Sequence, residues 1–391
     1  MNEKHDKPLS PETIVTHSGR EPFENRGYVN TPVYRGSTIL FPTLDALESP
    51  DNRYDYGRTG NPSSSAVEEL ISELEGAADT VLCPSGLSAI SLALMAVLGA
   101  GDEVLLSDSV YGPTRRVSDG VLQRMGISVR YYDPRAGKDI GALFTDKTKA
   151  VFVESPGSLT FEIQDLPAIA EAAHAANAVV IADNSWATPL YHKPLSLGAD
   201  IVVHAGTKMF VGHSDVMFGT VSTHSGLARQ LRRTHVQLGL CASPDDCFLA
   251  ARGLRTLAIR MKEHSARSTE IAAWLEGQPG VARVIHPALP SHPDHAIWQR
   301  DFTGAGSVFS IVLEPKPRAA LAAMVDGLKL FGMGASWGGY ESLCMPSNPA
   351  KIRTATSWDE PGPMVRFHIG LEGVEDLKSD LADGLARYRA S

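Results

Sequence analysis

Several features that define particular protein classes are missing from the sequence. None of the four cysteines forms a C-x-x-C pair, so neither a zinc framework nor a redox motif is indicated. Acidic residues outnumber basic ones by 45 to 36, and a net charge of −9 argues against the basic face that a nucleic-acid binder needs. The most apolar stretch, Leu87–Leu98, is shorter than the roughly 20 residues of a membrane span. The N-terminal residues are polar and do not form a signal peptide, so we expect a cytoplasmic protein with reduced thiols and no membrane association.

The length of 391 residues predicts a two-domain protein rather than a single small core. Apolar residues make up 43% of the chain, which is ordinary for a packed globular protein. Residues 1–60 are irregular and rich in Pro, Gly, Tyr and Arg. Such a segment is stable only when it lies on something else, so we predict an arm that contacts another subunit.

From Pro62 onward, short apolar runs alternate with helical patterns, beginning with a helix over Pro62–Gly76. Amphipathic segments such as Leu166–Asn177 separate the runs. This alternation indicates βαβ units and a mainly parallel sheet. The expected strands are Thr80–Cys83, Glu103–Ser107, Ser128–Tyr132, Ala150–Val153, Val179–Ala182, Ile201–Val203 and Val216–Thr223.

The C-terminal third has a different pattern. A long helical stretch over 244–276 leads to a region with two expected strands, Val308–Leu313 and Val365–Ile369, and a last helix near Val374–Arg389. We interpret this region as a smaller α/β domain. The predicted division is an N-terminal arm over 1–60, a large domain over 61–255 and a C-terminal domain over 256–391.

Candidate reactive residues follow the strands of the large domain, where parallel α/β sheets bind ligands. Lys208 lies just past IVVH among small and apolar residues, and desolvation would lower its pKa as imine formation requires. Asp183 follows VVIA and could face the ring nitrogen of pyridoxal 5′-phosphate (PLP). The turn Ser85–Ser88 opens an apolar helix and could bind a phosphate.

Each of these features also has an ordinary structural interpretation. The small-residue turn and Asp183 could merely cap helices, and a single lysine is more often solvent-facing than catalytic. Lys208 and Asp183 at two strand ends together favour the catalytic interpretation. His204, His213 and Asp215 could be metal ligands, but their spacing matches no helical pair and no common zinc pattern, so we expect no metal site.

Ten motifs along almost the whole chain resemble the Cys/Met-metabolism PLP-dependent enzymes. They are VNTPVYRGSTILFP, YDYGRTGNPS, CPSGLSAI, DSVYGPT, ESPGS, ADNSWATP, HAGTKMFVGHSDVMFG, ARGLRTLAIRM, SWGGYESL and RFHIGLEG. The resemblance implies a fold-type I PLP-dependent transferase (aspartate aminotransferase-like), with a mainly parallel large-domain sheet and a smaller C-terminal α/β domain. It also implies a homotetramer built as a dimer of dimers.

The resemblance assigns roles residue by residue. Lys208 is implied to bind PLP as a Schiff base and to transfer protons, and Tyr111 to stack on the PLP ring and share in catalysis. The other implied cofactor contacts are Asp183 at the ring nitrogen, Gly86, Leu87 and Thr207 at the phosphate, and Tyr56 and Arg58 at the phosphate of a neighbouring subunit. The implied substrate contacts are Arg366 at the α-carboxylate, with Ser336 and Trp337 lining the pocket.

Two positions depart from the family pattern. Ala205 stands where serine is usual, which predicts one missing hydroxyl contact to phosphate, and Ser185 stands where threonine is more common. The Ser336–Trp337 pair and Pro113 favour β-elimination of cystathionine to homocysteine, pyruvate and ammonia, as in methionine biosynthesis. The γ-acting members of the family are the close alternative, and a non-catalytic binding protein that kept the fold is a more distant one.

Overall fold

The computed structural model describes residues 9–391, and a seven-stranded sheet forms the centre of its larger domain. The strand order is β1-β7-β6-β5-β4-β2-β3, with β7 antiparallel to both neighbours and all the other pairs parallel. The mainly parallel sheet predicted from the sequence is therefore confirmed. The strands are β1 (Asp79–Cys83), β2 (Glu103–Ser107), β3 (Ser128–Tyr132), β4 (Thr148–Glu154), β5 (Val179–Asp183), β6 (Ile201–His204) and β7 (Gly219–Thr223).

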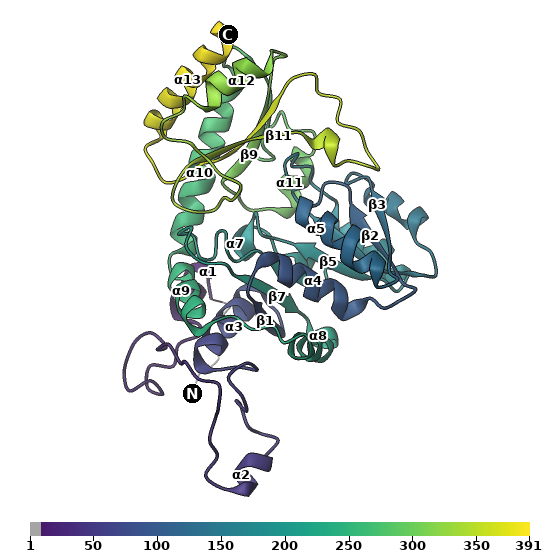
Figure 1. Ribbon diagram of the computed structural model, residues 1–391, viewed down its shortest axis with the longest axis vertical. Coiled ribbons are helices and arrows are strands. Elements are labelled where there is room, and N and C mark those ends of the chain that lie inside the picture. Colours follow the sequence, from purple (N-terminus) through teal and green to yellow (C-terminus); the bar gives the residue numbers. More distant parts are fainter. Residues whose placement is uncertain (1–8) are drawn as a thin grey trace.

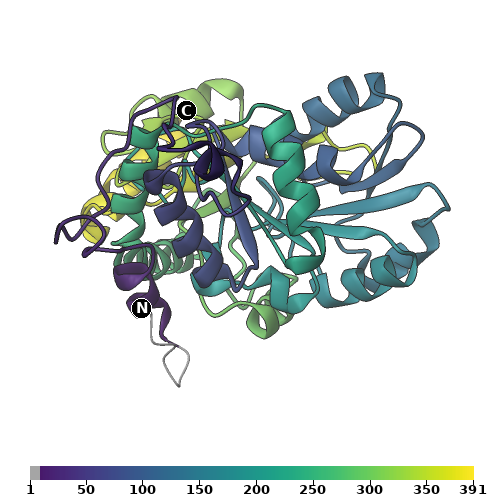
Figure 2. The same ribbon diagram turned by 90° about the horizontal axis from the view of Figure 1, so that it is seen from below.

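Alternate residues of each central strand enter two different apolar clusters. In β5, Ile181 packs in the cluster that contains α4 (Gly86–Val97), whereas Val180 packs in the cluster that contains α6 (Leu166–Ala175). Successive side chains of a strand point to opposite faces, so both faces of the sheet are covered. Figure 2 shows helices on both sides of the sheet.

Local sequence sets the bounds of the helices. Asn61 caps the start of α3 by accepting the N–H of Ser64, and Gly76 ends the helix in a left-handed conformation, with φ of 72°. The remaining helices of the larger domain and the arm are α1 (Pro11–His17), α2 (Leu44–Glu48), α3 (Pro62–Glu75), α5 (Gly112–Val117), α7 (Thr188–Tyr191), α8 (Ser225–Gln237) and α9 (Pro244–Leu254).

The C-terminal region contains its own five-stranded sheet, in the order β10-β11-β12-β9-β8. All of its pairs are antiparallel except β10 with β11. The smaller α/β domain is thus present, with more strands than the two that the sequence predicts. The strands are β8 (Val281–Ile285), β9 (Val308–Leu313), β10 (Gly332–Met333), β11 (Leu343–Ser347) and β12 (Met364–His368), and the helices are α10 (Leu257–Glu276), α11 (His295–Asp301), α12 (Arg318–Val325) and α13 (Val374–Ala390).

The long helical stretch expected over 244–276 is present and is divided into two helices. The chain forms α9 and α10, which are separate helices joined through Arg255 and Thr256. Arg255 donates from Nη1 to the carbonyls of Val15 and Ser18, both at 2.8 Å, and so fixes the junction against α1. Helix propensity is high on both sides of the junction, but this tertiary contact fixes where the helices separate.

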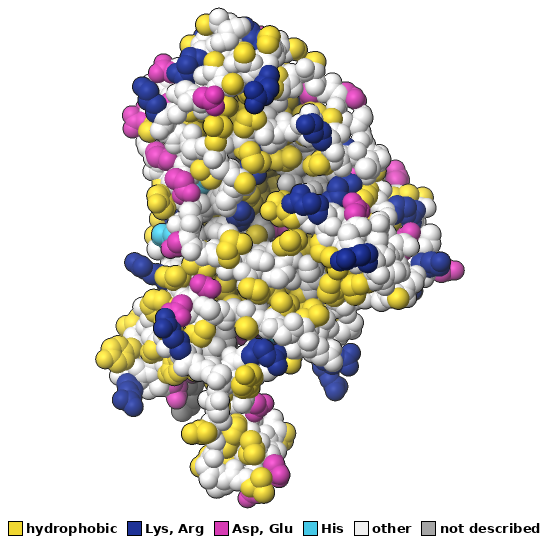
Figure 3. All heavy atoms as spheres, viewed as in Figure 1, with side chains coloured by type: hydrophobic (Ala, Val, Ile, Leu, Met, Phe, Trp, Pro, Cys, Tyr) yellow, Lys and Arg dark blue, Asp and Glu magenta, His cyan; other side chains and the backbone are white. Residues whose placement is uncertain are grey.

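The N-terminal arm extends away from the rest of the chain, with α2 at its far end in Figure 1. Several of its apolar side chains are exposed, among them Phe23, Leu40 and Leu44 at 94%, 89% and 65%. Figure 3 shows hydrophobic side chains at the surface of the arm. Apolar residues this exposed usually mark a contact surface.

The α9–α10 junction lies next to the predicted boundary at residue 256. The division into arm, large domain and C-terminal domain stays a prediction. Among residues 9–391, no helix combines the length and the apolar character needed to cross a membrane.

Candidate active site

A cavity of about 360 Å³ opens at the carboxyl ends of β4, β5 and β6. Residues of the C-terminal domain, including Val308, Trp337 and Arg366, close its other side. Figure 3 shows a hollow between the two domains. The cavity therefore lies where the sequence analysis expects ligand binding in a parallel sheet.

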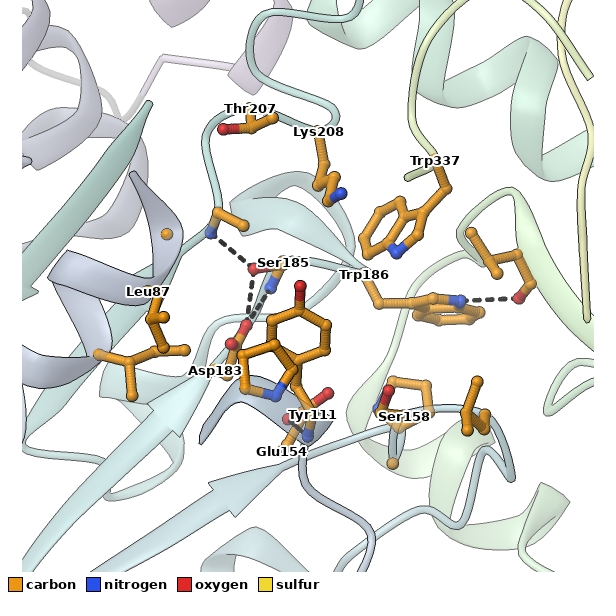
Figure 4. Close-up of a pocket in the computed structure, with 18 of the residues that line it drawn as sticks. Leu87, Tyr111, Glu154, Ser158, Asp183, Ser185, Trp186, Thr207, Lys208 and Trp337 are labelled. Carbon is orange, nitrogen blue, oxygen red and sulfur yellow. Dashed lines mark hydrogen bonds between the residues drawn. The ribbon is translucent and has the colours of Figure 1, made fainter. Parts of the chain in front are cut away.

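Lys208 points into this cavity, and Trp337 lies beside it (Figure 4). Its Nζ donates to Ser336 Oγ at 2.6 Å and lies 5.4 Å from the centre of the Trp337 ring. Burial, assisted by the positive charge of Arg366, lowers the pKa of Lys208 to about 8. A lysine of this kind is a nucleophile near neutral pH, unlike a solvated one.

Asp183 ends β5 at the base of the cavity, where a short chain of hydrogen bonds holds its carboxylate. The backbone N–H of Ala205 donates to Ser185 Oγ at 2.7 Å, and Ser185 Oγ donates to Asp183 Oδ1 at 2.6 Å. Ser185 N–H adds a second bond to Oδ1 at 2.9 Å (Figure 4). Burial raises the pKa of Asp183, and the bonds from Ser185 oppose that rise by favouring the ionised form.

The N-terminus of α4 forms one end of the cavity. Ser85 and Ser88 bond to each other in a capping box, with Ser85 Oγ accepting from Ser88 N–H at 3.1 Å and Ser88 Oγ from Ser85 N–H at 3.0 Å. Gly86 and Leu87 line the cavity, and within the described chain their N–H groups donate to no protein acceptor. Free N–H groups at the start of a helix bind anions.

Ala205 contacts this helix start directly. A Cβ atom on Gly86 would lie 2.6 Å from the Ala205 Cβ, so glycine is required for the two segments to approach this closely. Ala205 has no hydroxyl to offer a phosphate, and the Thr207 hydroxyl already donates to Phe218 O at 3.1 Å while accepting from Phe218 N at 2.8 Å. Thr207 nevertheless lines the cavity, next to Lys208.

Tyr111 lines the cavity, with its ring beside Asp183 (Figure 4). Its N–H donates to Glu154 Oε2 at 2.7 Å. Glu154 ends β4 opposite Asp183 in the strand register, so the two carboxyl groups are neighbours. Burial and then the charge of Asp183 raise the pKa of Glu154 well above its usual range.

Arg366 enters the cavity from β12. It is 7% exposed, and its Nη2 donates to the carbonyls of Ala335 and Ser336 at 3.2 and 3.0 Å. Its buried Nε has no partner in the described chain. Burial lowers the pKa of Arg366 to about 10, so the side chain remains charged at neutral pH. A buried guanidinium with a free donor suits a carboxylate ligand.

Most of the residues predicted from the sequence meet at this cavity, but Tyr56 and Arg58 do not. Arg58 donates from Nη1 to Val236 O at 2.9 Å, and its guanidinium lies 6.0 Å from the Tyr56 ring. Their role at the phosphate of a neighbouring subunit stays a prediction.

The three candidate metal ligands do not form a cluster. His204 Nε2 bonds to the buried carboxylate of Glu75, and His213 Nδ1 lies 2.6 Å from Val211 O. Among residues 9–391, no group of three potential metal-ligating His, Cys, Asp or Glu side chains is arranged to hold an ion.

Sequence reasoning missed two residues of the site. Glu154 occurs in the motif ESPGS, but its partner Tyr111 lies 43 positions away, so only the fold reveals the bond. Trp186 lines the cavity and donates from its indole nitrogen to Val308 O at 2.9 Å, which links the two domains. Its place directly after the Asp183–Ser185 segment is a usable signal for such a wall residue.

A half-buried lysine of lowered pKa, a nearby carboxylate, an aromatic ring and an anion-binding helix start together fit a phosphorylated pyridine cofactor. These features define a PLP enzyme of fold-type I. The chain belongs to the Cys/Met metabolism PLP-dependent enzyme family, whose model matches residues 12–386. The PLP cofactor predicted from the sequence is thereby confirmed.

The chain is similar over nearly its whole length to several named proteins. A provisionally named cystathionine beta-lyase of Rhizobium johnstonii is 47% identical, covering 97% of this chain and 96% of the relative. The cystathionine beta-lyase of Salmonella typhimurium is 40% identical, covering 98% and 99%. An L-alanine/L-glutamate racemase of Wolbachia pipientis is 38% identical, covering 97% and 98%.

A solved structure agrees with the fold. The cystathionine gamma synthase of Xanthomonas oryzae pv. oryzae, in complex with aminoacrylate and cysteine, superposes with a TM-score of 0.91 at 34% identity. The match covers 98% of this chain and 100% of that chain.

Proposed function

We propose that this protein is a cystathionine β-lyase that cleaves L-cystathionine to L-homocysteine, pyruvate and ammonia in methionine biosynthesis. The observation that carries the proposal is the bond from Lys208 Nζ to Ser336 Oγ, next to Trp337. It places the Ser-Trp pair, which the sequence analysis links to β-elimination, at the proposed catalytic amine. The names of two relatives support the same activity.

Different residues around the cavity would bind different parts of the cofactor. Gly86 and Leu87 would hold the phosphate through their N–H groups, Asp183 would face the ring nitrogen, Tyr111 would lie on the ring, and Lys208 would bind the aldehyde carbon. Thr207 would join the phosphate contacts once its hydroxyl turns from Phe218. When bound, PLP supplies an electron sink for the pair left by the substrate Cα–H bond.

Lys208 Nζ has the position and the pKa for proton transfer. With a pKa of about 8, roughly a quarter of the amine is neutral near pH 7.5 and can take the α-proton. The same nitrogen then returns a proton to the departing thiolate sulfur. Ser336 orients the amine through the 2.6 Å bond.

Arg366 would hold the substrate α-carboxylate through its free Nε donor. Because Arg366 is also bonded to the carbonyls of Ala335 and Ser336, it is fixed before substrate binds. Because the donors are already fixed, they lose little entropy when the carboxylate binds. A carboxylate held in one place would orient the Cα–H bond of the substrate toward Lys208. Trp186 and Trp337 shield this side of the cavity from water.

Two alternatives share the same cofactor site. A γ-acting enzyme is supported by the superposition on a cystathionine gamma synthase, and an amino-acid racemase by the 38% identity to the Wolbachia protein. Pro113, which lines the cavity after Tyr111, favours the β-lyase over a methionine γ-lyase, whose family pattern has cysteine there.

Product analysis distinguishes the three activities. Purified holoenzyme is given L-cystathionine, and the keto acid is identified by chromatography. Pyruvate with an equal amount of homocysteine supports the proposal, whereas 2-oxobutyrate overturns it in favour of γ-elimination. In a parallel assay the enzyme is given L-alanine. Conversion of L-alanine to D-alanine, together with no cleavage of cystathionine, overturns the proposal in favour of racemisation.

We further propose a homotetramer in the cytoplasm, with no nucleic-acid partner. The exposed apolar residues of the arm support a contact between subunits. Tyr56 and Arg58 would then reach the phosphate of the neighbouring subunit. Light scattering of the purified protein measures the assembly, and a monomer with full activity would contradict it.

A further inference from the structure

The loop between β10 and β11 carries Ser336 and Trp337 to the cavity, and β12 holds this loop in place. Arg366 bonds to its first carbonyls, as described above. Two positions further along β12, on the same side of the strand, His368 bonds to the next part of the loop. Gly338 N–H donates to His368 Nε2 at 3.2 Å, and Gly339 O lies 3.1 Å from the same nitrogen.

We propose that His368 is a positioning residue that sets the Ser336–Gly339 segment against Lys208. It is 1% exposed, and its Nδ1 lies 2.7 Å from Ser307 Oγ, so both ring nitrogens have partners. The proposal rests on the proposed role of Lys208 and deepens the β-lyase assignment.

The segment has little freedom to move without disturbing Lys208. Gly338 has a φ of 90°, and a Cβ atom there would lie 2.9 Å from the Lys208 Cα. The backbone of the loop is thus packed directly on the backbone of the catalytic lysine. A shift at Gly338 would also move Ser336 and Trp337, the two residues that precede it in the loop.

The neutral ring suits this task. Burial, with the nearby His264, Arg366 and Lys208, lowers the pKa of His368 to about 3. The neutral ring has one donor and one acceptor nitrogen. When Nδ1–H donates to Ser307, Nε2 accepts from Gly338 N–H, and in the other tautomer Nε2–H donates to Gly339 O. Either tautomer therefore keeps one bond to the loop.

Three variants test the proposal. His368→Leu removes both loop bonds, whereas His368→Gln keeps an acceptor and a donor at the side-chain end. His286→Leu is the matched control, because His286 is equally buried in the same domain but bonds to Ser268 Oγ and Ala288 N rather than to the loop.

The first readout is hydrogen exchange of the cofactor-free protein, followed by mass spectrometry of peptides covering residues 334–342. We expect faster exchange in this segment for His368→Leu, recovery in His368→Gln, and no change in His286→Leu. Peptides with the Ile369 N–H, which donates to Ser307 O, serve as an internal reference. Unchanged exchange in His368→Leu would overturn the proposal, whatever reaction the enzyme catalyses.

The second readout is steady-state kinetics of the holoenzyme with cystathionine. In His368→Leu, loss of the loop bonds should lower kcat/KM about tenfold or more. His368→Gln should recover most of the wild-type kcat/KM, and His286→Leu should keep the wild-type value. Equal losses in the His368→Leu and His286→Leu variants would reduce His368 to a general packing role and overturn the proposal. Should His368→Leu fail to fold, Ser307→Ala removes the Nδ1 partner that orients the ring and should raise exchange over residues 334–342 by a smaller amount; wild-type exchange in that variant would then overturn the proposal. If no variant and no wild-type protein cleaves cystathionine, the proposed function fails while the exchange experiment still decides the role of His368.

Discussion

The hydroxyl of Ser185 joins two segments that a PLP enzyme must keep in register. It donates to Asp183 Oδ1 and accepts from the N–H of Ala205, at 2.6 and 2.7 Å. Ser185→Ala removes both bonds and leaves the Ala205 N–H, which lies at the phosphate end of the cavity, without an acceptor. A hydrogen bond to a charged group contributes about 1.5–3 kcal/mol, so the ionised form of Asp183 should lose a comparable amount.

The loss should appear mainly in kcat. Asp183 acts by remaining ionised opposite the ring nitrogen, and burial already raises its pKa. If the full energy applies to the transition state, kcat falls by about tenfold to hundredfold. KM for cystathionine should change little, because Arg366 and the Ser336 loop do not contact Ser185.

Ser185→Thr is the control, since threonine keeps the hydroxyl and is the more common residue in the family pattern. Both variants are assayed for pyruvate release, and PLP affinity is measured by titrating the cofactor-free protein. We expect Ser185→Thr to remain within about twofold of the wild type in kcat, since the bond is kept. A Ser185→Ala enzyme with wild-type kcat and PLP affinity would refute the reasoning about Asp183.

Three further predictions concern the other residues of the cavity. In the cofactor-free protein, folding lowers the pKa of Lys208 from its usual 10.5 to about 8. Between these two pH values the unfolded chain binds more protons than the folded chain. The free energy of unfolding therefore rises with pH in this range, by up to about 1.4 kcal/mol per pH unit. Denaturant unfolding of Lys208→Met should lack this increment, and an identical pH slope in both proteins would contradict the buried lysine. Arg366→Lys keeps the charge but loses the planar fork, so kcat/KM should fall about tenfold to hundredfold, chiefly through KM; kinetics equal to wild type would exclude Arg366 as the carboxylate site. Glu154→Leu removes the acceptor for Tyr111 N–H and should weaken PLP binding about tenfold. Glu154→Gln keeps an acceptor and should bind PLP nearly as well as the wild type. Titration of both cofactor-free variants with PLP checks this, and equally weakened PLP binding in the two would assign the effect to the charge of Glu154.

Strand–helix alternation was sufficient to predict the large sheet, because its central strands are short apolar runs, and β2, β4, β5 and β6 each end in a polar residue. It could not predict that β7 runs antiparallel between β1 and β6, since strand direction depends on how the chain returns to the sheet. In the C-terminal domain, β10 has only two residues and β11 contains Pro346, so neither has the pattern of a strand. β11 forms because β12 offers it a partner, and β10 in turn pairs with β11.

The site was predictable to the extent that its residues follow strands or occupy family motifs. Lys208, Asp183 and Arg366 all lie at the cavity. Apart from the bonds between Ser185 and Asp183, the bonds that position them join residues far apart in the sequence and leave no local pattern. The chain of bonds from Ala205 through Ser185 to Asp183 joins the ends of β6 and β5. The contact of Gly86 with Ala205 joins the start of α4 to the end of β6.

The attachment of PLP to Lys208 is the central claim, and borohydride reduction tests it most directly. The yellow holoenzyme is reduced, digested, and analysed by mass spectrometry for the pyridoxyl modification. We predict that the modification lies on Lys208 alone and that Lys208→Ala protein remains unlabelled. A label on another lysine, or a wild-type protein that takes up none, would contradict the account.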